Sequence, residues 1–489
     1  MSRLFRRGAL VAVLVVAGGL ARRRARSAAP TDSPLRATSM LGRNREVAKV
    51  GARMGAGYAV HNARRALAGP ERRAELDEAF ELRTAEEVAA ALGSMKGALM
   101  KIGQMASFLD DGLPEPMRDA LSTLQADAPP MSSELAAQVV QEELGQPPTT
   151  LFAEWDERPL AAASIGQVHR AVTHDGHEVA VKVQYPGVDK AIISDLDNSD
   201  VLFSILGMVF PGLDPKPIVA EIRERVVEEL DYRAEAKQQT QFANWFEGHP
   251  FIHIPSVMSS YSSGRVLTTD LAHGARFAEV AETWSQEERD LAGESIYRFV
   301  FRSLYRFRAF NGDPHPGNYL FRPGGQVTFL DFGLVKHFTA ADIDLFEAMI
   351  RAIVLHDDAA EYRAIIEDAG LLRRNAPLSD EQVVDYFAHF YELVRTEGRQ
   401  PVTHEYAAET VRRMFDATGK GSEVPKYANV PPSFVVLQRI NLGLYAILAR
   451  LGATHDWLAL SRELWPQTND APKSELGMQE AAWLASRYA

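Results

Sequence analysis

Three polar side chains within one short stretch have the types and the spacing that phosphoryl transfer uses. In Asn311–Lys336, Asp313 precedes Asn318 by five positions on a loop rich in proline and glycine, and Asp331 follows an apolar run. Kinase-type transfer needs one carboxylate beside the attacking oxygen, plus an asparagine and a second carboxylate that hold magnesium on the nucleotide phosphates. Hard oxygen ligands suit that ion. The stretch therefore predicts a magnesium-phosphate site, with Asp313 as the catalytic group and Asn318 and Asp331 as metal ligands.

A lysine upstream could supply the cation that such a site needs. Residues 147–186 change from helical to extended periodicity, with two β-rich runs around the turn His174–Asp175–Gly176. Lys182 lies in the second run, VAVKV. Burying an ammonium group is costly unless an anion meets it, so we expect Lys182 to contact nucleotide phosphates and a helix glutamate. A lysine on an edge strand is the alternative, because such short runs are common.

An alanine-rich turn stands where a phosphate-covering loop is normally rich in glycine. It consists of Ala161, Ala162, Ala163 and Ser164, and only Gly166 remains of the expected glycines. Alanine allows a fairly close backbone approach but restricts positive φ. The turn therefore predicts an altered nucleotide preference.

The pattern of residues 218–242 predicts one long helix, and acidic residues cluster in it. Glu229, Asp231 and Glu235 lie on it, and the repulsion between Asp231 and Glu235, four residues apart, disfavours the isolated helix. A lysine from elsewhere, such as Lys101 or Lys182, would relieve that repulsion. A solvated acidic face is the alternative.

The region before the extended segment has a helical pattern. Thr84 and Glu87 form a capping box, and apolar residues follow at spacings of four and three. In the run LMKIGQMASF, Lys101 and Gln104 stand three apart and can share one helix face. A surface Lys and Gln at a helix end are the alternative.

The C-terminal half is mainly helical. Val266–Leu271 predicts a strand, Ser285 begins a bulky core helix, and Thr339 begins another helix soon after Gly333. Residues 434–453 are apolar but carry polar interruptions, which favours a core helix over a membrane span. The chain has no Ala-Pro-Glu element and no long activation segment, which protein kinases use to dock peptides. Peptide is therefore a poor substrate candidate.

Composition limits the classes of function. Hydrophobic residues make up 46% of the 489 residues and charged residues 24%, as in ordinary globular proteins, and the absence of cysteine excludes disulfides and thiolate chemistry. Residues 1–73 hold 16 Lys/Arg and three Asp/Glu, so the net charge of -12 leaves a strongly acidic body. Such a body argues against nucleic acid as the main partner, whereas the basic arm suits an anionic membrane surface. A solvated flexible arm is the alternative.

Residues 8–21 form a continuous apolar run between arginines. A spanning helix needs roughly 20 residues, and a secretory signal is not usually followed at once by an arginine cluster. The run predicts a shallow anchor on the cytoplasmic face of a membrane, with a disordered or misassigned start as the alternative.

The order of the motifs carries more information than any one of them. The chain contains MKIGQMASF, AAASIGQVH, VAVKV, EELDYRAEA, DPHPGN and DFG in that order. In this it resembles the UbiB-like family of atypical kinases, also called the AarF family, over about residues 92–338.

The resemblance implies a role for each matched residue. Lys101 and Gln104 would belong to the KxGQ helix that closes the usual peptide site, and Glu229 and Asp231 would be an acidic latch for Lys101. The alanine turn would cover the phosphates, and Lys182 and Glu235 would form the nucleotide-binding ion pair. The assignments of Asp313, Asn318 and Asp331 are unchanged. One departure is visible, because Asn311 stands where many relatives carry His.

The resemblance also implies an α+β, protein-kinase-like, two-lobed fold. We expect five segments: a basic, membrane-associating segment (1–75), a helical KxGQ extension (76–145), a nucleotide-binding N-lobe (146–272), a mainly helical C-lobe (273–465) and a tail (466–489).

The expected function is that of an ATP- and magnesium-dependent atypical kinase or ATPase that supports isoprenoid quinone or other membrane-lipid metabolism. Its expected partners are a nucleotide, a lipid or quinone-pathway component and an anionic membrane surface, and we expect it in the cytoplasm or on the inner membrane face. Two alternatives remain: a nucleotide-gated scaffold or lipid-binding protein, and an enzyme like the aminoglycoside phosphotransferases.

Overall fold

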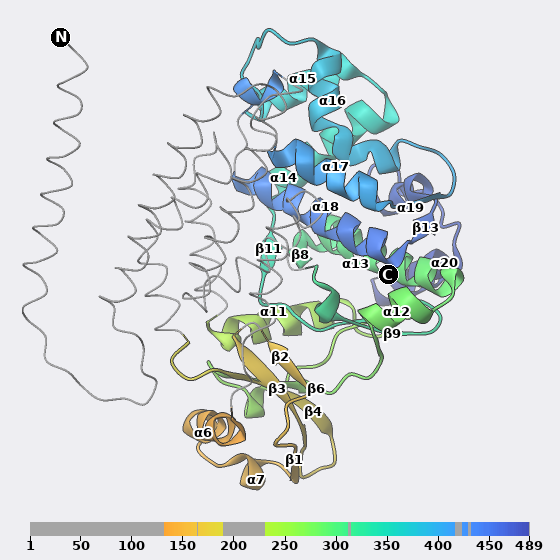
Figure 1. The fold of residues 1–489 in the computed structure, drawn as a ribbon. Helices are drawn as coiled ribbons and strands as arrows, with labels where there is room; N and C mark the ends of the chain where they lie inside the picture. The colour runs from red at the N-terminus through yellow and green to blue at the C-terminus, as the bar shows by residue number, and fades with distance from the viewer. Residues whose placement is uncertain are drawn as a thin grey trace, which may run out of the picture. The chain divides into compact units, whose positions relative to one another are not determined.

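The computed structural model describes residues 132–163, 165–188, 230–311, 314–415, 423–428 and 432–488. All of them belong to one compact unit, residues 50–489. The described residues combine mostly antiparallel sheets with many helices (Figure 1), as the predicted α+β class requires. The apolar run 8–21 and the helical pattern around Lys101 lie outside the described residues.

A five-stranded antiparallel sheet contains the predicted lysine strand. Its order is β1-β3-β4-β6, and β2 pairs with the free part of β3. The strands are β1 (Glu154–Trp155), β2 (Ala161–Ala163), β3 (Gly166–Val172), β4 (Glu178–Gln184) and β6 (Val266–Asp270). The chain turns between β3 and β4 at the predicted His-Asp-Gly position, and β6 confirms the strand predicted from Val266.

One face of this sheet is covered by α6 (Ser133–Leu144), with α7 (Pro148–Leu151) beside it. The apolar residues of α6 and the alternate valines of β4 form one buried cluster, which includes Val139, Val140, Val179, Val181 and Val183. Because successive side chains of a strand point to opposite faces, Lys182 lies on the face away from α6.

The acidic helix begins later than the sequence predicts. α11 (Tyr232–Trp245) is preceded by Asp231, whose extended backbone (φ -114°) and side chain cap it by accepting a hydrogen bond from the Arg233 amide. The prediction of one helix running through Asp231 is therefore wrong. An N-terminal cap satisfies a free helix amide, and it removes Asp231 from the i,i+4 repulsion with Glu235.

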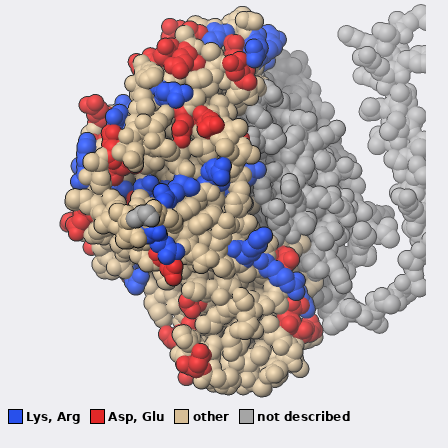
Figure 2. All heavy atoms as spheres, turned by 180° about the vertical axis from the view of Figure 1, so that it is seen from behind, with Lys and Arg blue, Asp and Glu red and all other residues tan. Residues whose placement is uncertain are grey.

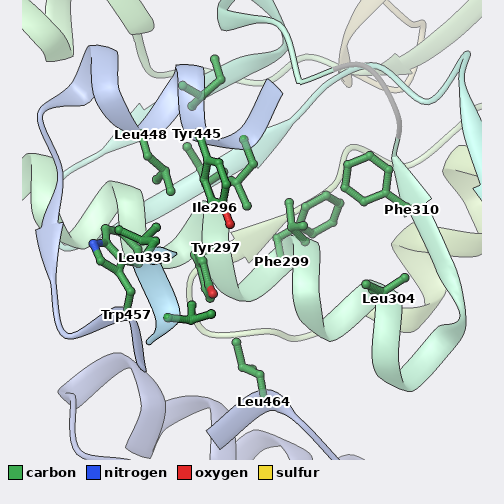
Figure 3. Close-up of a cluster of buried hydrophobic side chains, with 14 of the residues drawn as sticks. Ile296, Tyr297, Phe299, Leu304, Phe310, Leu393, Tyr445, Leu448, Trp457 and Leu464 are labelled. Atoms are coloured by element: carbon green, nitrogen blue, oxygen red, sulfur yellow. The ribbon is translucent and has the colours of Figure 1, made fainter. Parts of the chain in front are cut away.

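The second hydrophobic cluster surrounds α13 (Gln286–Phe307), which starts at the predicted cap Ser285. Figure 3 shows Ile296 and Tyr297 of this helix facing Tyr445 and Leu448 of α18 (Pro432–Leu451). The other helices are α12 (Phe277–Thr283), α14 (Ala340–Ile350), α15 (Ala359–Asp368), α16 (Asp380–Phe387), α17 (His404–Phe415), α19 (Trp457–Leu464) and α20 (Glu475–Arg487). The predicted core helices at 285 and 434 are thus confirmed.

Short strands and short helices complete the helical part. The strands are β5 (Ile252–His253), β7 (Ala275–Arg276), β8 (Ala309–Asn311), β9 (Tyr319–Arg322), β10 (Gln326–Phe329), β11 (Val335–His337), β12 (Gln400–Pro401) and β13 (Thr454–His455). The 3-10 helices are η2 (Ser259–Tyr261), η3 (Pro316–Asn318), η5 (His389–Val394) and η6 (Val424–Lys426), and η4 (Arg351–Leu355) is a π-helix. β8 pairs with β11, and β10 pairs with β9. These two pairings bring the predicted catalytic loop next to the segment that carries Asp331.

No helix in the described ranges is long and apolar enough to cross a membrane. On the face drawn in Figure 2, Lys and Arg side chains are interspersed with Asp and Glu side chains.

Candidate functional site: a lysine held between two carboxylates

The ammonium group of Lys182 lies between carboxylates that come from two distant parts of the chain. Its Nζ donates to Oε1 and Oε2 of Glu235 at 2.8 and 2.9 Å, and it lies 3.4 Å from Oδ2 of Asp331. The exposed fractions of the three side chains are 14%, 3% and 26%. The most exposed member of the group is therefore the Asp331 carboxylate.

These contacts keep the lysine charged. Burial alone would lower the pKa of Lys182, but the negative charges of Asp331 and Glu235 outweigh it and raise the pKa well above its ordinary value. The Tyr232 ring adds a cation–π contact, with its centroid 5.0 Å from Nζ. Lys182 is thus a fixed cation, suited to bind phosphate and unsuited to act as a base.

The sheet register places the alanine strand beside this lysine. Ala161 pairs with Val168, and Val168 pairs with Lys182, so their side chains form one row on one face of the sheet. Ala163 lies two residues further along the same face, whereas Ala162 points to the face that α6 covers. The predicted phosphate-covering segment is therefore a short exposed strand of a hairpin. Ser164, at its turn, lies outside the described residues.

Gly166 is required by a close approach of two strands. A Cβ at this position would lie 2.2 Å from the carbonyl oxygen of Val183. The sequence showed Gly166 only as the one glycine that remains of those expected in a phosphate-covering loop. In the structure its lack of a side chain lets β3 approach β4 beside the β2–β3 turn.

Glu235 is fixed by the helix that carries it. It lies in the first turn of α11 and is buried there with Tyr232, Gln239 and Phe242. The side-chain amide of Gln184, on β4, donates to the carbonyl oxygen of Leu230 at 2.8 Å, just before this helix. Sequence reasoning missed Tyr232, which lies within EELDYRAEA, and Gln184, which directly follows VAVKV.

Asp331 is held by its own loop and by β8. Its Oδ1 accepts a hydrogen bond from the Gly333 amide at 2.9 Å, and its carbonyl oxygen accepts one from the Asn311 side-chain amide at 2.5 Å. Phe332 is buried, with its ring centroid 5.0 Å from that of Phe242 on α11. Asn311 therefore ties the start of the predicted catalytic loop to the metal-binding segment.

The predicted metal ligand Asn318 ends the turn η3 (Pro316–Asn318), next to the Asp331 segment. Its carbonyl oxygen accepts a hydrogen bond from the Leu330 amide at 3.0 Å. In the described part of the chain, no group of three or more His, Cys, Asp or Glu could hold a metal. Mg²⁺ at nucleotide sites needs only one or two protein oxygens, together with phosphate and water, and Asn318 and Asp331 fit that donor set.

Five predicted site residues lie outside the described residues: Lys101, Gln104, Ser164, Glu229 and Asp313. The flanks of Asp313 are described, with Asn311 on β8 and Pro314 buried against α18. Asp231 is described, and its carboxylate caps α11.

Comparisons with known proteins agree with this geometry. Residues 123–365 match the model of the ABC1 atypical kinase-like domain. The chain is also 31% identical to the protein in the Rv3197–erythromycin complex from Mycobacterium tuberculosis, with a TM-score of 0.59, and the alignment covers 82% of this chain and 99% of that one. The chain belongs to the ABC1 atypical kinase-like family. The matched range contains Lys182, Glu235, Asn318 and Asp331.

Curated relatives of the chain include the atypical kinase COQ8 of Saccharomyces cerevisiae, named as mitochondrial. It is 27% identical over 373 residues, which are 76% of this chain and 74% of COQ8. The probable protein kinase UbiB of Pseudomonas fluorescens is 26% identical over 412 residues, 81% of this chain and 74% of UbiB. The chain spans about half the length of several other curated relatives. The predicted family, kinase-like fold and atypical-kinase class are confirmed.

Proposed function

We propose that the chain is an ATP- and magnesium-dependent atypical kinase or ATPase. The observation that carries this proposal is the Lys182 ammonium group, fixed by Glu235 and 3.4 Å from the partly exposed Asp331 carboxylate. Kinase-type sites use such a lysine on the nucleotide phosphates and such an aspartate on the metal.

Each residue then has a distinct task. Lys182 binds phosphate oxygens, and Glu235 holds the lysine in place when phosphate competes for its charge. Asp331 and Asn318 would hold magnesium, which supplies charge neutralisation on the phosphates when it is bound. Asp313 would accept the proton of the attacking hydroxyl or water, and the hydrogen bond from Asn311 to the Asp331 carbonyl keeps the two segments in register.

A role in isoprenoid quinone or membrane-lipid metabolism is part of this proposal. Its support is the similarity to COQ8 and UbiB, together with the basic, apolar N-terminus. We propose a peripheral location on the inner membrane face, which flotation of the full chain with anionic vesicles tests. Recovery in the protein-only fraction would count against it. The five-segment, two-lobed organisation is proposed on the same resemblance.

One observation favours a second candidate, a nucleotide-gated protein that binds a large apolar molecule. A relative covered over 99% of its length has been solved in a complex with erythromycin. In this case nucleotide binding would matter and turnover would be incidental.

Substitution of Asp331 tests the first proposal. We expect Asp331→Asn to lose magnesium-dependent ATP hydrolysis by roughly a hundredfold or more, because the metal ligand and a charge are removed together. Phosphate release by the purified full chain is the measurement. Asp358→Asn is the matched control, since Asp358 caps α15 and asparagine caps a helix equally well. Equal turnover in Asp331→Asn and wild type would refute the mechanism.

Two further variants separate the candidates. If catalysis is the function, complementation of a deletion strain should fail with both Lys182→Ala and Asp313→Asn. If nucleotide-gated binding is the function, complementation should fail with Lys182→Ala and survive with Asp313→Asn.

A further inference from the structure

The last helix of the described chain is bonded to the end of the helix that carries Glu235. Arg487 Nη2 donates to the Asn244 carbonyl oxygen at 2.8 Å, and the Tyr488 hydroxyl donates to the Trp245 carbonyl oxygen at 2.8 Å. Trp483 Nε1 donates to the carbonyl oxygen of Glu247 at 3.1 Å.

These donors satisfy groups that a helix end normally leaves free. The last four carbonyl oxygens of a helix have no partner within it, and a cation near them is favourable because they form the negative end of the helix dipole. α11 ends at Trp245, so Asn244 and Trp245 contribute two of those carbonyl groups. Arg487 also lies 2.8 Å from the Glu247 carboxylate. α20 therefore caps α11 from outside.

The capping helix is itself fixed to α13. Oε2 of Glu480 accepts a hydrogen bond from Arg298 at 3.0 Å, and its Oε1 accepts one from Arg302 at 2.9 Å. Glu480 and Arg298 are each only 1% exposed. Since buried and hydrogen-bonded charge pairs cost much free energy to break, these contacts hold α20 in a fixed position on α13.

Tyr488 joins both helices at one point. Its ring lies 4.1 Å from the Arg306 guanidinium and 6.3 Å from the Phe307 ring at the end of α13, while its hydroxyl caps α11. Trp245 also stacks on Phe307, with ring centroids 4.6 Å apart. The end of α13 leads directly to β8 and Asn311, so this junction adjoins α11, which carries Glu235, and β8, which carries Asn311.

We propose that α20 is a positioning element for the nucleotide site, in which Trp483, Arg487 and Tyr488 hold α11 so that Glu235 stays on Lys182. These residues touch neither Lys182 nor Asp331 and act through the helix. The path runs from the capped end of α11 through Phe242, which contacts Phe332 of the Asp331 segment, to the first turn that carries Glu235.

Amide hydrogen exchange of the full chain tests this role without any assumption about turnover. The variant Arg487→Gln/Tyr488→Phe removes two donors and keeps the aromatic ring on Arg306. We expect exchange of the Ala236–Gln239 amides, two turns away from the cap, to become roughly three- to tenfold faster, since α11 opens more readily.

The matched control is Arg363→Gln on α15. Arg363 makes the same kind of contact, because its guanidinium donates to the carbonyl oxygens of Leu378 and Ala376. It should leave exchange in Ala236–Gln239 unchanged. Faster exchange confined to the last turn of α11, or the same acceleration in the control, would show that α20 only stabilises the fold and would overturn the proposal.

A second measurement rests on the proposed function. The Arg487→Gln/Tyr488→Phe variant should raise KM for ATP more than it lowers kcat, since Lys182 is less well held before the nucleotide binds. Arg363→Gln should change neither KM nor kcat. An unchanged KM alongside faster exchange would show that α11 moves without affecting the site and would also overturn the positioning role. If the wild-type chain does not hydrolyse ATP, the proposed function fails, and the exchange result still decides the role of α20.

Discussion

The two carboxylates on Lys182 are not equivalent. Glu235 is almost wholly buried and contacts Nζ with both oxygens, whereas Asp331 is partly exposed and makes a single contact at 3.4 Å. A phosphate group that binds Lys182 as proposed would therefore compete first with Asp331, the proposed metal ligand. The buried Glu235 keeps the lysine charged throughout.

The two faces of the alanine strand β2 are expected to differ in their effect on nucleotide binding. Ala161 lies in the same row as Lys182, so Ala161→Val adds two methyl groups on the nucleotide side. We expect a roughly tenfold weaker affinity for ATP, because side-chain crowding prevents close approach of the phosphates. Calorimetric titration with ATP measures it.

Ala162→Val is the control for this prediction, since it adds the same groups one residue along on the opposite face. Its affinity should stay within about twofold of wild type. A similar loss of ATP affinity in both variants would mean that the nucleotide does not bind on the face shared by Ala161 and Lys182.

Sequence reasoning reached the charged residues of this site but missed their uncharged support. Lys182, Glu235 and Asp331 belong to motifs in which the type of each residue is enough to predict its chemical role. Tyr232 and Gln184 act through contacts that exist only once β4 and α11 meet, and nothing in their spacing indicates those contacts. The same limit explains Gly166, whose role depends on the carbonyl oxygen of Val183 on the neighbouring strand.

At the element scale, α18 supports the predicted catalytic loop through a glycine. A Cβ at Gly443 would lie 2.1 Å from Cγ of Pro314, the residue that follows Asp313. Two such atoms cannot be this close, and the ring is held by its neighbours in a buried position. The helix therefore approaches the loop as closely as a backbone without a side chain allows.

Gly443→Ala tests this contact. Alanine normally stabilises a helix by about 1 kcal/mol relative to glycine, but here its methyl group must displace the loop at Pro314. We expect kcat/KM for ATP to fall by about a hundredfold, as for a displacement of about 1 Å at a catalytic group. Steady-state kinetics and thermal unfolding give the two readouts.

An outcome in which Gly443→Ala is more stable and fully active would show that Pro314 is free to move. Asn441→Ala, on the same helix and two residues away, is the control for changes in helix stability. It should leave kcat/KM near the wild-type value.

Helix starts were readable from sequence where a local cap decides them. Ser285 and Thr339 accept hydrogen bonds from backbone amides three residues later, and both begin helices as predicted. The start of α11 was misplaced because the acidic run before it has a good helical pattern, and only the extended backbone of Asp231 reveals the cap. An aspartate is compatible with both positions, so composition could not choose between them.

At the scale of the whole molecule, a buried network of charges joins helices far apart in the sequence. Arg298 donates to Glu294 on its own helix, to Glu463 on α19 and to Glu480 on α20. Arg302 shares Glu480. Two arginines thus face three carboxylates. Nε2 of His455 lies 3.0 Å from Glu294, where protonation of the ring would balance the charge.

The network predicts a dependence of stability on pH. Burial and Arg399 lower the pKa of His455, but its contacts with Glu294 and the Asp456 carbonyl group outweigh them and raise the pKa above the usual value. A raised folded-state pKa favours the protonated form, so its contribution is full below the unfolded pKa of about 6.5 and is lost as pH rises through the folded value. The free energy of unfolding should therefore decrease over that window.

Denaturant unfolding at several pH values measures the effect. His455→Gln should flatten the slope in this window, whereas His356→Gln, which replaces an exposed histidine, should leave it unchanged. A slope that persists in His455→Gln would assign the dependence to another group.

No pattern in the sequence predicted the buried charge network around Arg298. Arg298 lies inside the aromatic run of α13, and its partners Glu463 and Glu480 lie on α19 and α20. Local propensity could place each helix but could not pair charges 165 and 182 residues apart. The C-terminal region, predicted only as a tail from residue 466, is consequently the part of the fold that the sequence described least.

The separation of Arg298 from Glu480 has a consequence for synthesis. α13 emerges from the ribosome well before α19 and α20, so Arg298 has Glu294 of its own helix from the start and gains Glu463 and Glu480 only later. Since a guanidinium group that lacks two of its three carboxylates is costly to bury, we expect the core around Arg298 to close only after α19 and α20 have been made. A chain is synthesised at about 5–20 residues per second, so many seconds pass between the synthesis of Arg298 and that of Glu480. During that time we expect the apolar surface of the incomplete domain to be a target for chaperones.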